Sequence, residues 1–230
     1  LVLVRRETSS EAQFDGCYSG FSQVNECLSV YDFAGSRAAL NYESGGITQS
    51  LAYALTENDR DNLSEGVSAF GAEGELERWE YQLGLTALPG FDLIAGVDLE
   101  REVNGSDERD NSGVYAEVLS DFSDSWFLTL GLRQDDNEDF GEFTSYRVSS
   151  AYLIDLGGST LKFKGAIGRG FRAPSLYEVS YNQSPWAAPP AAGLALNAEQ
   201  SSGFEVGVEY SAERYAVEVV AFQQDVEDAI

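Results

Sequence analysis

Histidine, the side chain most often used for acid–base and metal chemistry, is absent from this chain of 230 residues. A serine or cysteine nucleophile activated by histidine is therefore impossible within it, and so is a zinc or non-haem iron site with histidine ligands. A pair of carboxylates could still act as general acid and base. Because no spacing among the acidic residues singles out such a pair, we expect no catalytic residues and no enzyme activity.

Carboxylates are the abundant charged group, with 39 Asp and Glu residues against 14 Lys and Arg. The net charge of −25 argues against a nucleic-acid partner, because backbone phosphates would be repelled. Clustered carboxylates can bind calcium, and the candidates for this are Asp107, Asp110, Asp135 and Asp136. None of the acidic runs matches the EF-hand pattern. We therefore expect a solvated, salt-adapted surface without a metal cofactor, with calcium at these four residues as the alternative.

The elements that position these side chains are predicted to be β-strands. Apolar and polar residues alternate over segments of roughly ten residues, most clearly at 78–88, where Trp79, Tyr81 and Leu83 share one face. Similar segments along the chain and an N-terminal strand at 1–7 bring the expected total to about eleven strands. Helical patterning is scarce, which excludes a fold of alternating strands and helices.

The connections between these strands alternate in length. Short turns are expected near 44–46, 88–90, 123–125, 155–158 and 212–214, and long connections near 7–34, 57–73, 103–111, 135–142 and 170–199. In an antiparallel meander every second connection lies on the same side, so the short turns share one end of the sheet. This asymmetry is typical of an up-and-down transmembrane β-barrel with short periplasmic turns and long extracellular loops.

Alternation alone also fits a soluble barrel or sandwich whose apolar face points inward. Three features favour the membrane barrel. The strands have the length needed to cross a bilayer, and the polar faces carry glycine and charges of both signs, as a barrel interior does. Aromatic residues also gather beside the short turns, as at a membrane interface: Phe91, Phe122, Trp126, Tyr210 and Tyr215. No apolar stretch is long enough for a transmembrane helix.

Two segments carry a family resemblance: 168–178 reads GRGFRAPSLYE and 196–210 reads LNAEQSSGFEVGVEY. The first resembles the barrel signature of TonB-dependent outer-membrane receptors, in which a strand ends in G-x-G-F-[RK]-A-P-[ST]-L-x-E. The second resembles the L-x-P-E-x-S-x-x-x-E-x-G-x-E segment of that family, with Ala198 in place of the usual proline. The matching residues are Gly170, Phe171, Arg172, Ala173, Pro174, Ser175, Leu176, Glu178, Glu199, Ser201, Glu205 and Gly207. The resemblance covers most of the chain from about residue 74 and is closest to the cobalamin- and siderophore-receptor type.

The resemblance implies that residues 1–230 are part of one receptor β-barrel domain of about 22 strands. The N-terminal plug, the first strands and the last strands are expected to be missing, and the lack of methionine also fits a piece of a longer protein. The implied function is TonB-dependent uptake, across the outer membrane, of a scarce nutrient such as a ferric siderophore or cobalamin. The implied partner is a TonB-type energy-transducing protein that engages the missing N-terminal part. A passive porin-like channel is the alternative, and a hydrolase or a soluble adhesin fits the residues less well.

The resemblance also gives roles to single residues. A receptor barrel passes through the oxidising periplasm, which predicts a disulfide between Cys17 and Cys27 that stabilises its loop by roughly 2–3 kcal/mol. Pro174 is expected to end a strand, and Arg172 and Glu178 are expected to pair at the loop base. The candidate ligand contacts are aromatic residues of the long connections, which could instead pack on one another: Tyr18, Phe21, Tyr31, Tyr177, Tyr181 and Trp186.

Overall fold

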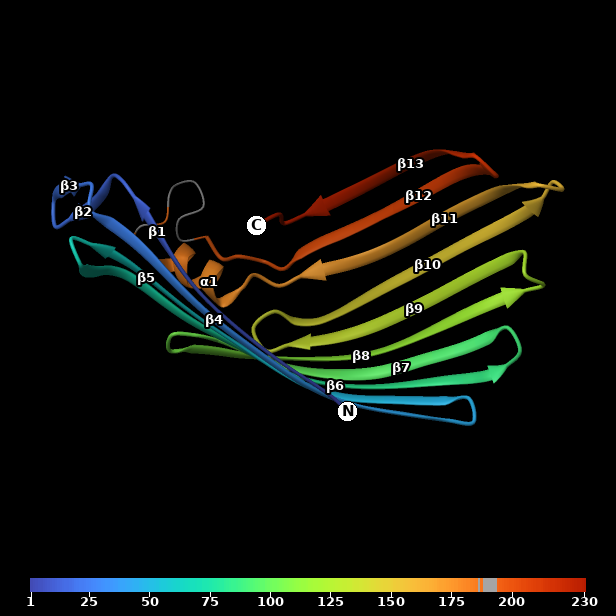
Figure 1. Ribbon diagram of the computed structural model, residues 1–230, viewed down its shortest axis with the longest axis horizontal. Helices are drawn as coiled ribbons and strands as arrows, with labels where there is room; N and C mark the ends of the chain where they lie inside the picture. The colour runs from blue at the N-terminus through green and yellow to red at the C-terminus, as the bar shows by residue number, and fades with distance from the viewer. Residues whose placement is uncertain (186, 188–193) are drawn as a thin grey trace.

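The computed structural model describes residues 1–185, 187 and 194–230, and within them one curved antiparallel sheet dominates (Figure 1). Eleven strands of this described part follow one another in chain order across the sheet. They are β1 (Val2–Phe14), β4 (Cys27–Ser44), β5 (Ile47–Ser64), β6 (Val67–Leu88), β7 (Phe91–Asn104), β8 (Asp107–Phe122), β9 (Trp126–Asn137), β10 (Gly141–Asp155), β11 (Ser159–Arg172), β12 (Glu199–Ala212) and β13 (Tyr215–Glu227). Between β1 and β4, the short strands β2 (Cys17–Ser19) and β3 (Ser22–Val24) form a separate hairpin. The all-β meander of about eleven strands is confirmed.

The five short turns lie where they are predicted, together at one end of the sheet (right in Figure 1). Gly90 shows why such a turn forms, because its φ of +77° is a left-handed conformation that glycine adopts without strain. The turn at 123–125 reaches the same geometry without glycine. Its Asp124 has a φ of +54°, and the backbone N–H of Asp124 donates to the Asp121 carboxylate at 2.9 Å.

At the other end of the sheet, most of the segments predicted as long loops are instead parts of paired β-strands. The prediction of long loops is wrong for these segments. β5 and β6 run through 57–73 and are joined at 65–66, β7 and β8 are joined at 105–106, and β9 and β10 at 138–140. The apolar alternation fades in these segments because most residues of both faces are polar, while backbone pairing continues from the flanking strands, with one shift of register between Asn62 and Leu63. The connection from β11 to β12 contains the helix α1 (Leu176–Gln183).

One face of the sheet is a continuous apolar surface. Directly opposed residues of six neighbouring strands form a single row across it: Leu93, Val118, Leu130, Val148, Ile167 and Phe204. Leu130, Ile167 and Phe204 are each more than 40% exposed, so no described part of the chain covers them. Beside the short turns, the predicted interface aromatics do gather, as in the edge-to-face contact of Phe91 and Phe122 at 5.4 Å. Such a surface fits the lipid-facing side of a barrel.

The opposite face is concave and carries α1 (Figure 1). β1 and β13 are the edges of the sheet and are not paired with each other in the described residues. Two open edges cannot face lipid, because their unpaired backbone groups would find no hydrogen-bond partner there. The sheet therefore has the form of a wall segment rather than a closed barrel. In the same described part, no helix is long and apolar enough to cross a membrane.

Candidate functional site

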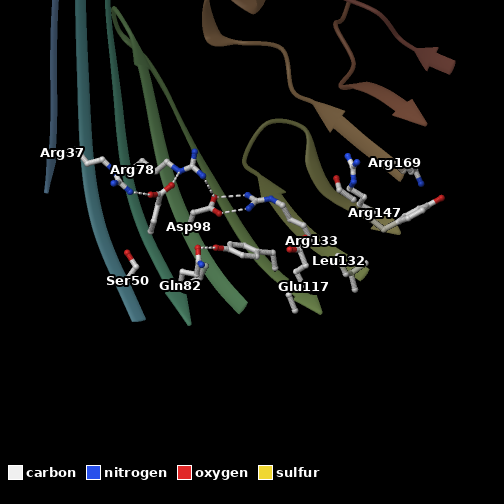
Figure 2. Close-up of a pocket in the computed structure, with 17 residues that line it drawn as sticks. Arg37, Ser50, Arg78, Gln82, Asp98, Glu117, Leu132, Arg133, Arg147 and Arg169 are labelled. Atoms are coloured by element: carbon white, nitrogen blue, oxygen red, sulfur yellow. Dashed lines mark hydrogen bonds and ion pairs between the residues drawn. The ribbon is translucent and has the colours of Figure 1, made fainter. Parts of the chain in front are cut away.

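A row of paired charges crosses the concave face from β4 to β9 (Figure 2). The carboxylate of Asp98 accepts two hydrogen bonds from the guanidinium of Arg133, at 2.6 and 2.9 Å. Arg78 lies 3.8 Å from the same carboxylate, and Arg37 reaches Glu80 at 3.1 Å. Because Asp98 is only 4% exposed, its charge is balanced by Arg133 and Arg78 rather than by water. The row links β4, β6, β7 and β9 across the inner wall.

Side chains of this row lie close against the sheet because neighbouring glycines have no side chain in the way. Gly113 on β8 is directly opposite Asp98, and a Cβ at this position would overlap the guanidinium of Arg133. Tyr115 lies in the same way over Gly96, where a Cβ would be 2.5 Å from the ring. A cavity of about 550 Å³ is left beside the row on the concave face.

The motif residues 172–178 build the base of the long connection after β11. Ser175 is the N-cap of α1: its hydroxyl accepts from the Glu178 N–H at 3.2 Å, and the Glu178 carboxylate accepts from the Ser175 N–H at 2.8 Å. Arg172 pairs with Glu178 at 3.0 Å, which confirms the predicted pair. The hydrogen bond from Arg172, helped by those from Ser175, lowers the pKa of Glu178 from its ordinary value. The apolar pattern predicts no helix here, yet Ser175-x-x-Glu178 is a capping box, the signal that could have revealed it.

The two halves of the family motif lie side by side, because β11 and β12 pair directly. Arg172 is opposite Glu199 and Gly170 is opposite Ser201 at the loop end of this pair, and Glu205 and Gly207 follow further along β12. Ala198, which stands at the usual proline position, is buried. Both ends of the connection 173–198 are therefore held by one paired base.

The start of the connection is anchored to a distant part of the wall by Arg109 of β8. Its Nη1 donates to the carbonyl oxygen of Pro174 at 2.6 Å, and its guanidinium also pairs with Glu102 of β7. Glu102 accepts in turn from the Leu176 N–H at 3.2 Å. Arg109 is 6% exposed and Pro174 is fully buried. Since β9 and β10 separate β8 from β11 in the sheet, these bonds fold the connection inward across the concave face (Figure 1).

No sequence motif indicates Arg109 or Glu102. Strand alternation could have predicted their pairing, because the two residues are directly opposite on β7 and β8. Their bonds to Pro174 and Leu176 span 65 and 74 positions of the chain, and only the curvature of the sheet brings these groups together. The β9–β10 turn also reaches Arg109, with Asp139 at 3.8 Å.

A chamber of about 560 Å³ lies between this anchored connection and the inner wall. Its lining includes four amide side chains, two inward carboxylates, two aromatic rings and the anchoring arginine: Asn58, Asn104, Asn111, Asn137, Glu100, Glu102, Phe171, Tyr177 and Arg109. Phe171 is fixed by stacking on Phe143, with ring centroids 4.3 Å apart. The chamber can hold a ligand through hydrogen bonds and ring contacts.

The predicted ligand contacts are only partly brought together. Tyr177 and Tyr181 stack on the surface of α1 with centroids 6.2 Å apart, and both rings are about half exposed. Tyr18 and Phe21 belong to the β2–β3 hairpin and Tyr31 to β4, so they lie on other elements than this pair. Trp186 lies outside the described residues. Among the described candidates, Tyr177 is the one that lines the chamber.

The four calcium candidates do not converge. Asp135 pairs with Arg133, and Asp136 points to the opposite face because the two residues are neighbours on β9. Asp107 and Asp110 lie on β8, at the β7–β8 hairpin. In the described part of the chain, no group of three or more His, Cys, Asp or Glu residues is placed to hold a metal ion. Calcium binding by these loops stays a prediction.

The disulfide between Cys17 and Cys27 is present, with Cα atoms 6.0 Å apart. It ties the β2–β3 hairpin to the start of β4, and the Cys17 sulfur lies 3.3 Å from the hydroxyl of Ser64 at the end of β5. This confirms the predicted pairing and places it at the loop end of the sheet, away from the short turns.

An apolar outer face, a charged inner face and a connection folded inward define the wall of a membrane β-barrel. The family model for the β-barrel of TonB dependent receptor-like proteins matches residues 8–230. The chain therefore belongs to this family, and it is part of an outer-membrane barrel whose short turns are periplasmic.

Individual relatives are distant. The chain is 24% identical over 229 residues to the vitamin B12 transporter BtuB of Photobacterium profundum, which covers 96% of this chain and 35% of the relative. It is 24% identical over 182 residues to the ferric enterobactin receptor PirA of Pseudomonas aeruginosa, covering 73% of this chain and 24% of the relative. The solved siderophore receptor PirA of Acinetobacter baumannii matches with a TM-score of 0.72 at 15% identity, covering 99% of this chain and 41% of that structure. The chain thus spans about a third of the length of the first of these relatives.

Proposed function

We propose that this chain is the middle part of the barrel of a receptor for TonB-dependent uptake of a large, scarce nutrient, of the ferric siderophore or cobalamin kind. The observation that carries the proposal is the inward anchoring of the 173–198 connection by Arg109 and Glu102. This connection narrows the interior and forms a chamber at its extracellular end. A receptor that holds one ligand needs such a chamber, whereas a passive pore needs an open lumen.

Further strands are expected to complete the barrel at the edges of β1 and β13, because neither edge has a partner in the described residues. We also propose that a plug domain fills the interior and that a TonB-type protein acts on it from the periplasm. The relatives are transporters and receptors by name, and in this proposal the receptor performs no covalent chemistry. Binding and release of the ligand are then the whole of its work.

Growth rescue tests this proposal. The full-length receptor is expressed in a strain that lacks its own cobalamin and siderophore receptors, with vitamin B12 or a ferric siderophore as the limiting nutrient. Rescue by one of these nutrients, and loss of rescue when TonB is deleted, is the expected result. Uptake that persists without TonB would indicate a passive channel and would refute the receptor proposal.

A further inference from the structure

We infer that the chamber beneath the β11–α1 connection takes a neutral or cationic ligand that carries amide or hydroxyl groups, and that it excludes polyanions. This inference rests on the proposed uptake function and names the ligand class for it. The relatives leave the question open, because one is named for vitamin B12 and another for ferric enterobactin. The charges around the chamber decide it.

Arg109, the cationic side chain in the described lining of the chamber, already has partners within the protein. Arg109 donates to Pro174, pairs with Glu102 and lies 3.8 Å from Asp139, and it is almost completely buried. Carboxylates outnumber it in the lining, which also includes Glu75 and Glu100. An anionic ligand would find no free guanidinium or ammonium group in the described lining, and it would have to compete with Glu102 for Arg109 and with Glu100 for Arg78.

The neutral polar groups of the chamber define what it can bind. Asn58, Asn104 and Asn111 present side-chain amides, each of which can donate and accept hydrogen bonds. Amides and hydroxyls of a ligand match such groups without any charge. The rings of Phe171 and Tyr177 add surfaces for a flat apolar part, and the negative face of an aromatic ring favours a cation over an anion.

The approach to the chamber is also acidic. The hairpin ends at this side of the sheet carry the carboxylates Glu57, Asp59, Glu73, Asp107, Glu108, Asp110, Glu138 and Asp139. Arg101 and Arg172 at the same end are bridged to Glu108 and Glu178. Such a field repels an incoming polyanion and concentrates cations.

Three arginines of the inner wall belong to the charged row, and Arg147 lies beside that row in the same cavity (Figure 2). Arg37, Arg78 and Arg133 of that row are paired with carboxylates. Arg78 also lies 3.7 Å from Glu100, which lines the chamber. Glu100 therefore has two effects on the chamber. It contributes a carboxylate to the lining, and it pairs with Arg78, so that this guanidinium is not free to bind a ligand.

Binding of a charge-varied set of ligands tests the inference. The purified full-length receptor is placed in equilibrium dialysis at low salt with vitamin B12, an uncharged iron trihydroxamate or a polyanionic iron tricatecholate. We expect the tricatecholate to bind at least roughly tenfold more weakly than the better of the other two. The Glu100→Gln variant should strengthen tricatecholate binding about three- to tenfold and leave the uncharged ligands within about twofold, and high salt should remove the gain.

Two variants serve as controls. Glu213→Gln removes a carboxylate from the β12–β13 turn at the opposite end and should change no affinity. Glu100→Asp keeps the charge and should bind like the native receptor, which shows that the site tolerates a change at this position.

Equal affinity for tricatecholate and uncharged ligands, or an unchanged ratio of these affinities in Glu100→Gln, overturns the inference. TonB-dependent uptake of the tricatecholate in cells would overturn it while leaving the proposed function in place, whereas absence of TonB-dependent uptake for all three ligands overturns the proposed function itself.

Discussion

Replacing Arg109 with alanine should release the 173–198 connection from the inner wall. The change removes a 2.6 Å charge-assisted hydrogen bond to the Pro174 carbonyl and the ion pair with Glu102. Hydrogen bonds of charged groups contribute about 1.5–3 kcal/mol each, and breaking a buried pair costs about 3–5 kcal/mol. Glu102 is 26% exposed in its side chain and keeps its bond from the Leu176 N–H, so water takes over part of the loss. We therefore expect the closed connection to lose about 2–3 kcal/mol relative to open forms.

Hydrogen–deuterium exchange of the receptor in detergent micelles measures this loss directly. The amides of α1 should exchange about 30- to 150-fold faster in Arg109→Ala, because 1.4 kcal/mol corresponds to about a factor of ten. Arg101→Ala is the matched control: it lies in the same hairpin, and its pair with Glu108 is exposed on both sides, so the effect should be within about 0.5 kcal/mol. Equal exchange of α1 in the two variants would show that Arg109 does not anchor the connection.

Three further predictions concern other parts of the wall. Gly113→Ala should destabilise the barrel by about 1–3 kcal/mol, because the new methyl group displaces Arg133 from Asp98; thermal unfolding should show no comparable loss for Gly71→Ala, where the nearest atom lies 3.7 Å from an added Cβ. The protection of α1 should fall on acidification: the pKa of Glu178 is lowered in the folded state, so its stabilising contribution is complete above its ordinary value of 4.5 and is lost as pH falls through the lowered value. A protection factor of α1 that is independent of pH in this range, or equally dependent in Glu178→Gln, would contradict that assignment. Asp59 lies directly opposite Asp32 and Glu73, so Asp59→Asn should stabilise the β4–β6 extension at low salt and lose this benefit at high salt, which limited proteolysis at two ionic strengths would detect.

Much of the fold follows from local sequence patterns. The alternation in 78–88 and its neighbours predicts strands and their faces, because side chains of a strand point to opposite sides at every second residue. The five short turns are equally local, as Gly90 and the Asp121–Asp124 turn show. The strands at the long-connection end are harder to predict from the sequence. At 57–73 and 103–111 most residues of both faces are polar, so the alternation disappears although the backbone remains paired.

The candidate site was predictable only where its parts are neighbours in the chain. Arg172 and Glu178 are six residues apart, and the capping box of Ser175 and Glu178 spans a single helical turn. The aromatic residues were predicted as one group, yet Tyr177 and Tyr181 share α1 while Tyr18 and Tyr31 belong to β2 and β4. Spacing in the sequence does not tell which loop folds inward.

The sequence by itself determined the strand pattern, the number of strands, the end at which the short turns lie, the disulfide and the family. All of these depend on residue type and on neighbours along the chain or across one hairpin. The tertiary structure alone decided that Arg109 anchors Pro174, that an amide-lined and acidic chamber lies beneath α1, and that Arg37, Arg78 and Arg133 are gathered in one row of the wall. Those contacts depend on the curvature of the sheet. Curvature accumulates from small twists over many strands, and no local segment of the sequence encodes that sum.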